Sequence, residues 1–191
     1  MVNIVLFGPP GVGKGTQSKR IISKYHLNHI STGEILRKAI EENTPLGREA
    51  QKHIDQGYYV PDEMAVKIIQ HELAKYPQSR GFIFDGFPRT INQADRLEEM
   101  LRIIGAKINV MISLEANEQV IVRRLIHRYN QSARPDDKSL EIIQKRIAIY
   151  DTNTKIVKDY YKKKGKCESV CGIGEIDVIF DKICSIIERY K

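Results

Sequence analysis

A glycine-rich segment near the N-terminus constrains the fold of this chain more than any other feature of its sequence. It reads Gly8-Pro9-Pro10-Gly11-Val12-Gly13-Lys14-Gly15-Thr16. The segment joins the apolar run 2–7 to a helix-like stretch at 17–25, and a strand, a glycine-rich turn and a helix start form a cradle for phosphate. Lys14 adds a point charge for the terminal phosphates of a nucleotide. The segment therefore predicts an α/β unit that binds nucleotide phosphates.

The end of this segment departs from the common pattern, in which Ser or Thr follows Gly-Lys and contacts Mg²⁺. Gly15 occupies that position here, and the hydroxyl comes one residue later at Thr16. We therefore expect this loop to hold the Mg²⁺ of a bound nucleotide less directly than most phosphate loops do.

A second motif begins where the apolar run 82–84 ends, and it reads Asp85-Gly86-Phe87-Pro88-Arg89-Thr90. An Asp at such a place often only caps a turn, but the carboxyl end of a parallel strand is also where ligands bind. Because the phosphate loop is present, we expect Asp85 to hold Mg²⁺, directly or through water. Gly86 permits close approach of a ligand to the backbone, and Arg89 offers a planar fork for phosphate. Phe87-Pro88 is a candidate cis peptide bond.

Length, composition and charge narrow the class of protein. A chain of 191 residues with 41% hydrophobic residues suits one domain with a packed core. No apolar run is long enough to span a bilayer, and the first residues form a core strand rather than an export signal. We therefore expect a cytoplasmic protein without a membrane partner. The net charge of +7 indicates an anionic partner, but the basic residues are dispersed and lack interleaved aromatics, which favours small polyanions over nucleic acid.

The three cysteines, Cys167, Cys171 and Cys184, are an odd number in a chain with no visible export signal. Reduced thiols follow from that combination. No His or second Cys pair completes a tetrahedral ligand set around Cys167 and Cys171, so we expect no structural zinc. The prediction for all three is burial as small apolar side chains.

Short apolar runs alternate with amphipathic stretches from one end of the chain to the other. Strands are predicted at 2–7, 82–84, 109–114 and, more weakly, 170–171, and helices at 62–74, 93–104 and 117–129. Strands separated by helices of this length need crossover connections, which produce a parallel sheet covered on both faces. The chain is therefore predicted to be α/β.

Two regions read as inserts in this pattern. The stretch 32–60 is polar and mostly helical, with breaks at Thr44-Pro45 and Gly57, and contributes no evident strand. Residues 129–133 read as a small polar turn between Arg128 and Arg134. The run 138–164 then reads as one or two helices.

Three motifs of the chain, taken together, resemble those of one known family. The motifs GPPGVGKGTQ, STGEILR at 31–37 and DGFPRT followed by Gln93-Ala94 are similar, in that order, to those of the adenylate kinase family. The resemblance covers essentially the whole chain and implies a P-loop kinase fold, with a doubly wound five-stranded parallel sheet in one domain, 1–191. It also implies a monomer, an AMP-binding insert at 31–60 and a short lid at 128–134 of the type without zinc.

The resemblance also assigns residues to sites. The residues that it implies for ATP are Gly11, Val12, Gly13, Lys14, Gly15, Thr16, Arg124, Arg128 and Gly174. Those that it implies for AMP are Thr32, Arg37, Tyr58, Tyr59, Val60, Gly86, Phe87, Pro88, Arg89, Gln93, Arg134 and Arg146. The catalytic set that it implies is Lys14, Arg89, Arg128, Arg134 and Arg146. An amide side chain such as that of Gln93 suits the adenine edge, since it both donates and accepts.

The arginines fit the chemistry that this family performs. Arg124 and Arg128 are four apart on a predicted helix, so they share one face. Phosphoryl transfer needs alignment of two substrates and neutralisation of charge on the moving oxygens, and several guanidiniums with Lys14 and Mg²⁺ supply both. Catalysis by alignment and charge neutralisation requires no general base.

The reaction implied by the resemblance is reversible transfer of the terminal phosphoryl of Mg-ATP to AMP, with ATP, AMP and ADP as partners. A UMP/CMP kinase is the nearest alternative, but Thr32 and the Thr90-x-x-Gln93 pattern disfavour it, because pyrimidine kinases tend to carry Ala and Asn there. A nucleotide-dependent assembly factor with vestigial turnover is a second alternative. Binding alone does not need arginines around the transferred group, so the kinase interpretation is preferred.

Overall fold

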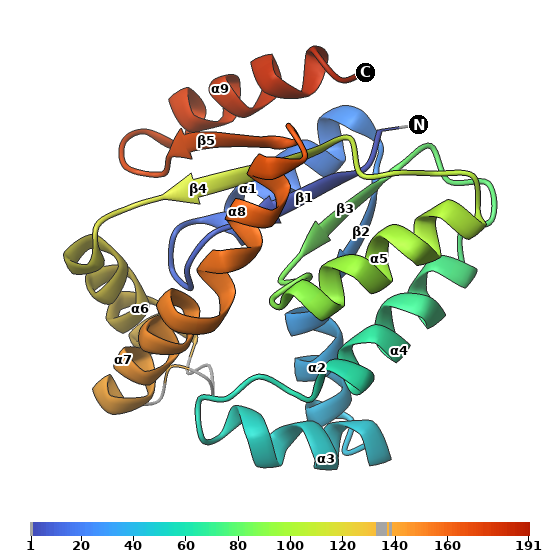
Figure 1. Cartoon of the computed structure of the whole chain (residues 1–191). Helices are drawn as coiled ribbons and strands as arrows, with labels where there is room; N and C mark the ends of the chain where they lie inside the picture. Colours follow the sequence, from blue (N-terminus) through green and yellow to red (C-terminus); the bar gives the residue numbers. More distant parts are fainter. Residues whose placement is uncertain (1, 133–136, 138) are drawn as a thin grey trace.

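Five parallel strands form one sheet in the computed structural model, which describes residues 2–132, 137 and 139–191 (Figure 1). The strands are β1 (Ile4–Phe7), β2 (Asn28–Ser31), β3 (Phe82–Asp85), β4 (Val110–Glu115) and β5 (Cys167–Cys171). Their order across the sheet is β2-β3-β1-β4-β5, so that β1 lies at the centre and the edges are β2 and β5. All four pairings are parallel, which confirms the doubly wound five-stranded sheet.

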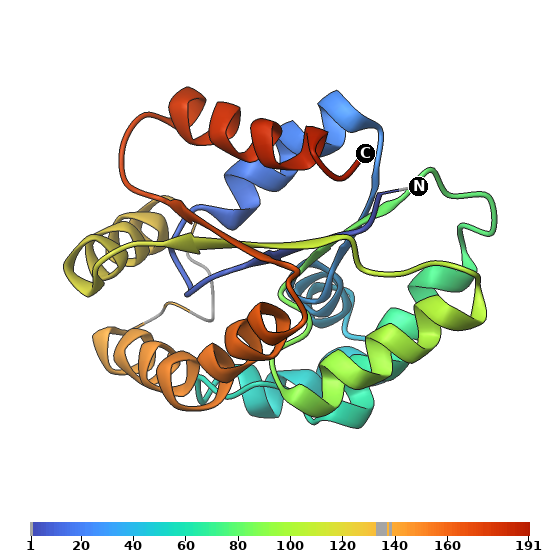
Figure 2. The ribbon, with the colours of Figure 1, turned by 45° about the horizontal axis from the view of Figure 1, so that its top comes forward.

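Helices cover both faces of this sheet, as the alternating pattern predicts. The helices of the described residues are α1 (Lys14–Tyr25), α2 (Thr32–Glu41), α3 (Pro45–Ile54), α4 (Asp62–Ala74), α5 (Ile91–Ile103), α6 (Glu118–Ser132), α7 (Leu140–Ile149), η2 (Tyr150–Thr154), α8 (Lys155–Lys163) and α9 (Ile176–Glu188). Figure 2 shows α1 and α9 together on one face and α5 and α8 on the other, with α4 beside α5. Helices α6 and α7 lie beyond the carboxyl ends of the strands, so they border the edge where ligands bind.

Two apolar cores, one on each face, follow from the alternation of side chains along each strand. In β1, Ile4 and Leu6 pack in the core beneath α1 and α9, and Val5 and Phe7 pack in the core beneath α5 and α8. All four residues of β1 are buried. A strand buried on both faces reads as a continuous apolar run, which is why the sequence predicts β1 so clearly.

One strand is not predicted from the sequence. β2 (Asn28–Ser31) pairs with β3 alone, at the edge of the sheet, and Asn28 and His29 are only half-buried there. An edge strand needs no continuous apolar run, so its pattern is too weak to identify. The predicted strand at 170–171 is the end of β5, which begins at Cys167.

The polar turn predicted at 129–133 is wrong for the residues that the structure describes. Helix α6 continues to Ser132, so 129–132 are helical, and residue 133 lies outside the described residues. The stretch 32–60 is mostly helical, as its pattern predicts, since α2 and α3 fill most of it and no strand occurs between Thr32 and Val60, all of which are described. Gly57 has a positive φ of 76°, which fits the break predicted there.

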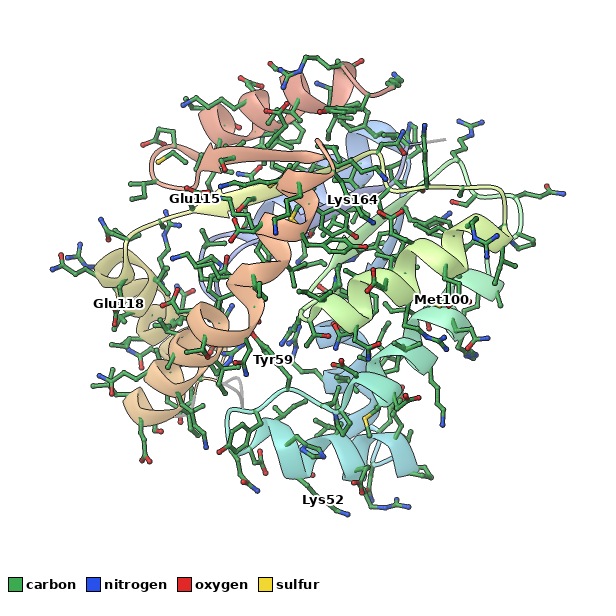
Figure 3. All side chains as sticks on the ribbon, in the orientation of Figure 1. Lys52, Tyr59, Met100, Glu115, Glu118 and Lys164 are labelled. Atoms are coloured by element: carbon green, nitrogen blue, oxygen red, sulfur yellow. The ribbon has the colours of Figure 1, made fainter. Side chains whose placement is uncertain are left out.

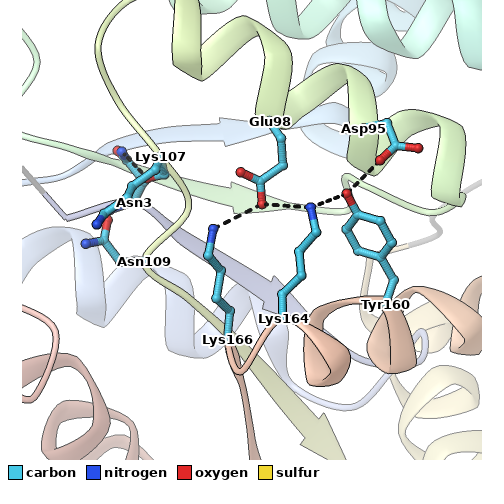
Figure 4. A network of polar contacts seen from close by, with 8 residues as sticks. All are labelled: Asn3, Asp95, Glu98, Lys107, Asn109, Tyr160, Lys164 and Lys166. Atoms are coloured by element: carbon cyan, nitrogen blue, oxygen red, sulfur yellow. Dashed lines mark hydrogen bonds and ion pairs between the residues drawn. The ribbon is translucent and has the colours of Figure 1, made fainter.

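A polar network connects the two helices that cover the same face of the sheet, as Figure 4 shows. Tyr160 of α8 donates a hydrogen bond of 2.6 Å to Asp95 of α5 and accepts one of 2.5 Å from Lys164. Lys166, just before β5, lies 3.3 Å from Glu98 of α5. These contacts hold the C-terminal end of α8 against α5.

The three cysteines are free thiols, but their burial differs from the prediction. Cys184 on α9 is buried, Cys167 is half-buried and Cys171 is exposed. The last two belong to β5, an edge strand with part of its surface in solvent, so the prediction of burial holds only for Cys184. Within the described part of the chain, no helix is both long enough and apolar enough to cross a membrane.

Candidate active site

The glycine-rich segment forms the connection between the end of β1 and the start of α1. Helix α1 begins at Lys14, three residues earlier than the sequence predicts, and Gly13 precedes it with a φ of 110°. This conformation is open to glycine and strained for other residues, so Gly13 lets the chain turn directly into the helix. Gly15 and Thr16 are exposed in the first turn, where the positive end of the helix favours an anion.

Lys14 folds back over this loop. Its Nζ donates hydrogen bonds to the carbonyl oxygens of Gly8 (2.8 Å) and Pro9 (3.0 Å). Loss of hydration on burial lowers the pKa of Lys14 from its ordinary 10.5 to about 8, while the carboxylate of Asp85 raises it and nearby guanidiniums such as that of Arg89 lower it further. The ammonium is therefore poorly solvated and held by neutral acceptors, so an anion in the loop would stabilise its charge.

A large cleft opens above the loop at the carboxyl edge of the sheet. The residues predicted for ATP that line this cleft are Gly11, Val12, Gly13, Lys14, Gly15, Thr16, Arg124, Arg128 and Gly174. Arg124 donates hydrogen bonds to the carbonyl oxygens of Val12 (3.1 Å) and Gly172 (2.9 Å), so it connects α6 to the loop and to the turn after β5. The structure brings the whole predicted ATP set to one cavity.

Asp85 lies in the same cleft, at the carboxyl end of β3, and is 9% exposed. His29 Nε2 is 4.0 Å from its Oδ2. Among residues 2–132, 137 and 139–191, no cluster of three or more His, Cys, Asp or Glu could hold a metal ion. A single carboxylate beside a phosphate loop fits Mg²⁺, because this ion keeps several waters and takes phosphate oxygens rather than an all-protein cage.

A second pocket lies between the helical insert and the DGFPRT segment. The residues predicted for AMP that line it are Thr32, Arg37, Tyr58, Tyr59, Val60, Gly86, Arg89, Gln93 and Arg146. Thr32 is the first residue of α2, and its hydroxyl donates a hydrogen bond of 3.0 Å to the carbonyl oxygen of Gly86. That bond attaches the insert to the end of β3, so the two walls of the pocket keep a defined separation.

Arg89 is positioned by three separate contacts within this second pocket. Its Nε donates to the carbonyl oxygen of Gly86 at 2.7 Å, and its backbone N–H donates to Oε1 of Gln93 at 2.8 Å. Its guanidinium lies 4.1 Å from the ring centroid of Tyr59, a side chain that Figure 3 shows between the insert and η2. A cation held over an aromatic face in this way gains electrostatic stabilisation. The planar fork therefore has a defined place before any ligand binds.

The two pockets share part of their lining. Gly33, Arg37, Gly86, Arg89 and Arg146 border both of them. Three of these five residues are arginines, which come from α2, from the segment after β3 and from α7. The phosphate ends of two ligands, one in each pocket, would therefore face the same group of positive charges.

A buried acid that the sequence analysis missed lies among these arginines. Asp137 is 1% exposed and forms ion pairs with Arg128 of α6, at 2.5 Å, and with Arg146 of α7. One carboxylate thus connects two guanidiniums from different helices, which orients both of them. The sequence feature that could have indicated a role for Asp137 is the run Arg134-Pro135-Asp136-Asp137, in which two acids follow an arginine assigned to the lid.

Two of the described residues predicted for AMP do not line the second pocket. Phe87 and Pro88, joined by a cis peptide bond as expected, are buried and line a smaller neighbouring cavity that also contains Lys14 and Arg89. Arg134 lies outside the described residues, as does part of the expected lid at 128–134.

Comparison with known proteins agrees with this geometry. The sequence matches the family profile described as Adenylate kinase over residues 6–166. A protein named Adenylate kinase from Bacteroides fragilis is 47% identical over 188 residues, which are 98% of this chain and 99% of that relative. Proteins of the same name from Phocaeicola vulgatus and Flavobacterium johnsoniae are 46% and 42% identical over 99% of this chain and all of their own length. With a phosphate loop, two pockets and a shared group of arginines in place, the chain belongs to the adenylate kinase family.

Proposed function

We propose that this protein transfers the terminal phosphoryl group of Mg-ATP to AMP, giving two ADP, and that it catalyses the reverse reaction as well. The observation that carries this proposal is the common lining of the two pockets by Arg37, Arg89 and Arg146. A protein that only binds one nucleotide has no need of a second pocket whose phosphate end meets the first. The name Adenylate kinase of the relatives supports the same reaction.

On the donor side, the backbone of 11–16 surrounds the ATP phosphates, and Gly174 lies beside the adenine. Lys14 exchanges its two carbonyl partners for phosphate oxygens and carries positive charge to the bond that breaks. Asp85 would hold Mg²⁺, which would supply positive charge to the phosphates. The charge of this carboxylate also raises the pKa of Lys14, against the larger lowering by burial.

On the acceptor side, Arg37 and Arg89 take the phosphate of AMP, while Gln93 and Thr32 face its base. The backbone at 58–60 contacts the adenine from the insert. The bond from Thr32 to Gly86 and the contact of Arg89 with Tyr59 make this pocket largely preformed. A preformed acceptor pocket lowers the entropic cost of alignment.

At the junction, Arg89, Arg128, Arg134 and Arg146 stabilise the negative charge that spreads over the moving oxygens. Alignment and charge neutralisation account for the rate of phosphoryl transfer in this scheme, so no residue acts as a general base. The insert at 31–60 and the short lid at 128–134 close over the substrates and exclude water, since an open site would hydrolyse ATP.

We further propose that the protein acts as a monomer on free nucleotides in the cytoplasm. Residues of a single chain line both pockets, so a second subunit is not needed to complete the site. The basic surplus of the chain then serves small polyanionic substrates rather than nucleic acid.

The test is a comparison of acceptors. Purified protein is mixed with Mg-ATP and, in separate reactions, with AMP, CMP, UMP or GMP, and the diphosphates are quantified by anion-exchange chromatography. We expect rapid formation of ADP with AMP and slow reactions with the other three. Preference for CMP or UMP would instead indicate the pyrimidine kinase, and binding of ATP with no diphosphate formed would indicate an assembly factor.

Substitution of the loop lysine tests the donor side. Lys14→Met should lower kcat on the order of a thousandfold, because it removes a preorganised charge from the transferred phosphoryl group. Lys67→Met, at an exposed position of α4, is the matched control and should leave kcat unchanged. Near-normal turnover of the Lys14 variant would exclude this lysine from the catalytic set.

A further inference from the structure

Asp62 connects three polar side chains beside the acceptor pocket. It is the first residue of α4, and its carboxylate accepts hydrogen bonds from Thr90 Oγ1 (2.7 Å), Gln93 Nε2 (2.6 Å) and Asn92 Nδ2 (3.2 Å). Thr90 in turn is the N-cap of α5 and accepts from the backbone N–H of Gln93 at 3.1 Å. The carboxylate therefore joins the starts of two helices at the place where Gln93 projects into the pocket.

The amide of Gln93 has only one orientation that suits its neighbours. Oε1 accepts from the backbone N–H of Arg89, a group that can only donate, and Nε2 donates to Asp62, a carboxylate that can only accept. If the amide rotated so that its oxygen and nitrogen exchanged places, the oxygen would face the carboxylate of Asp62. The NH₂ group would then face the backbone N–H of Arg89. Gln93 is 2% exposed, so water cannot relieve those contacts.

We propose that Asp62 is a specificity-determining residue, which acts by locking the amide of Gln93 so that the acceptor pocket takes a 6-aminopurine and rejects a 6-oxopurine. After its two internal bonds, the amide retains one N–H to donate and one oxygen lone pair to accept. Adenine offers an acceptor at N1 and a donor at its 6-amino group, which matches. Hypoxanthine offers a donor at N1 and an acceptor at O6, so both contacts become repulsive. This inference rests on the proposed function.

Without the carboxylate of Asp62, only the backbone N–H of Arg89 would oppose rotation of the Gln93 amide, so Gln93 could pair with a 6-oxopurine at a lower cost. The carboxylate makes that rotation unfavourable because it forms a charge-assisted bond in one orientation and opposes an oxygen in the other. Discrimination of this kind is strong, since a buried polar group that is left unpaired costs more than a lost apolar contact. Asp62 itself does not line the pocket, so it acts through Gln93 rather than by contact with the base.

The experiment compares AMP with IMP, which share ribose and phosphate and differ only at the purine edge. The test variant is Asp62→Asn, because it keeps the shape but offers a donor and an acceptor to either orientation of Gln93. We expect the ratio of kcat/KM for AMP to that for IMP to fall about tenfold or more, with KM for ATP unchanged. Glu63→Gln, an exposed acid in the same helical turn, should leave the ratio at its wild-type value.

A merely structural role for Asp62 would lower kcat/KM for both acceptors equally, and an unchanged ratio in the Asn variant would overturn the proposal. If circular dichroism shows that this variant is unfolded, Asp62→Ser is tested in its place, because a hydroxyl group also both donates and accepts. The ratio of kcat/KM for AMP to that for IMP should again fall. If the wild-type protein phosphorylates AMP and IMP equally well, the proposed role of Asp62 is refuted but the proposed function is not. Wild-type protein that does not phosphorylate AMP would refute the proposed function instead.

Discussion

At the scale of single residues, the environment of Lys14 favours the binding of a negatively charged ligand. Its ammonium is bound to two carbonyl oxygens of its own loop, and loss of hydration brings its pKa down to about 8. Phosphate oxygens would supply the negative charge that the carbonyl groups lack. Binding of a nucleotide should therefore raise this pKa again, which makes affinity depend on pH.

The sign of that dependence is definite. Below pH 8 the free protein already carries charged Lys14, so affinity for ATP should vary little with pH. Above pH 8 the free protein has lost this proton and must regain it on binding, so Kd should rise, by about tenfold per pH unit at most. Isothermal titration calorimetry from pH 7 to 9.5 measures this, and a rise of the same size in Lys14→Met would contradict the assignment.

At the scale of elements, the arginines depend on how two helices meet. Arg128 lies near the end of α6 and Arg146 lies in α7, and the buried carboxylate of Asp137 contacts both. Held in this way, the guanidiniums keep their orientation toward the cleft that each of them lines. The geometry of the junction between the pockets is therefore a property of the α6–α7 pair.

Substitution of this acid tests the arrangement. Asp137→Asn keeps the shape but removes the charge, so both guanidiniums lose a fixed partner, and kcat should fall by about tenfold to a hundredfold through misalignment. Asp159→Asn, on the exposed surface of α8, is the control and should have wild-type kcat. Steady-state kinetics with saturating ATP and AMP measure the effect, and an unchanged or increased kcat in the Asp137 variant would refute it.

At the scale of the whole molecule, the cores and the pockets lie largely apart, although Leu36, Val60 and Ala65 belong both to a core and to the lining of the second pocket. The two cores lie on the faces of the sheet, while both pockets open at its carboxyl edge. Leu97 on α5 is fully buried in the core beneath α5 and α8, whereas Ile103 on the same helix is 73% exposed. Loss of packing at Leu97 should therefore destabilise the protein without altering the site.

Leu97→Ala should lower the free energy of unfolding by about 2–5 kcal/mol, because it removes buried methyl groups and leaves a cavity. Ile103→Ala should change it by less than about 0.5 kcal/mol, as exposed substitutions usually do. Urea denaturation measures both values, and kcat at 25 °C should match wild type in each variant. Equal effects of the two substitutions would show that α5 does not pack as described.

What the sequence determined by itself is local or periodic. The phosphate loop at 8–16, the strand before it and the carboxylate at the end of β3 follow from runs of neighbouring residues, since backbone freedom and strand burial are set within a few positions. The parallel sheet covered on both faces follows from the alternation of strands and helices. The grouping of Gln93 with the adenine side needed the family resemblance as well, because a lone amide on a helix is ordinary.

Only the tertiary structure decided what meets across the chain. Arg37, Arg89 and Arg146 come together although more than a hundred residues separate the first from the last. The edge strand β2, the extension of α6 to Ser132, the pairing of Asp137 with two arginines and the bond from Asp62 to Gln93 were equally hidden. The pairing of β2 with β3 and the contacts of Asp62 and Asp137 form only after the elements have packed against one another, so no periodicity along the chain encodes them. Periodicity likewise does not fix the residue at which α6 ends.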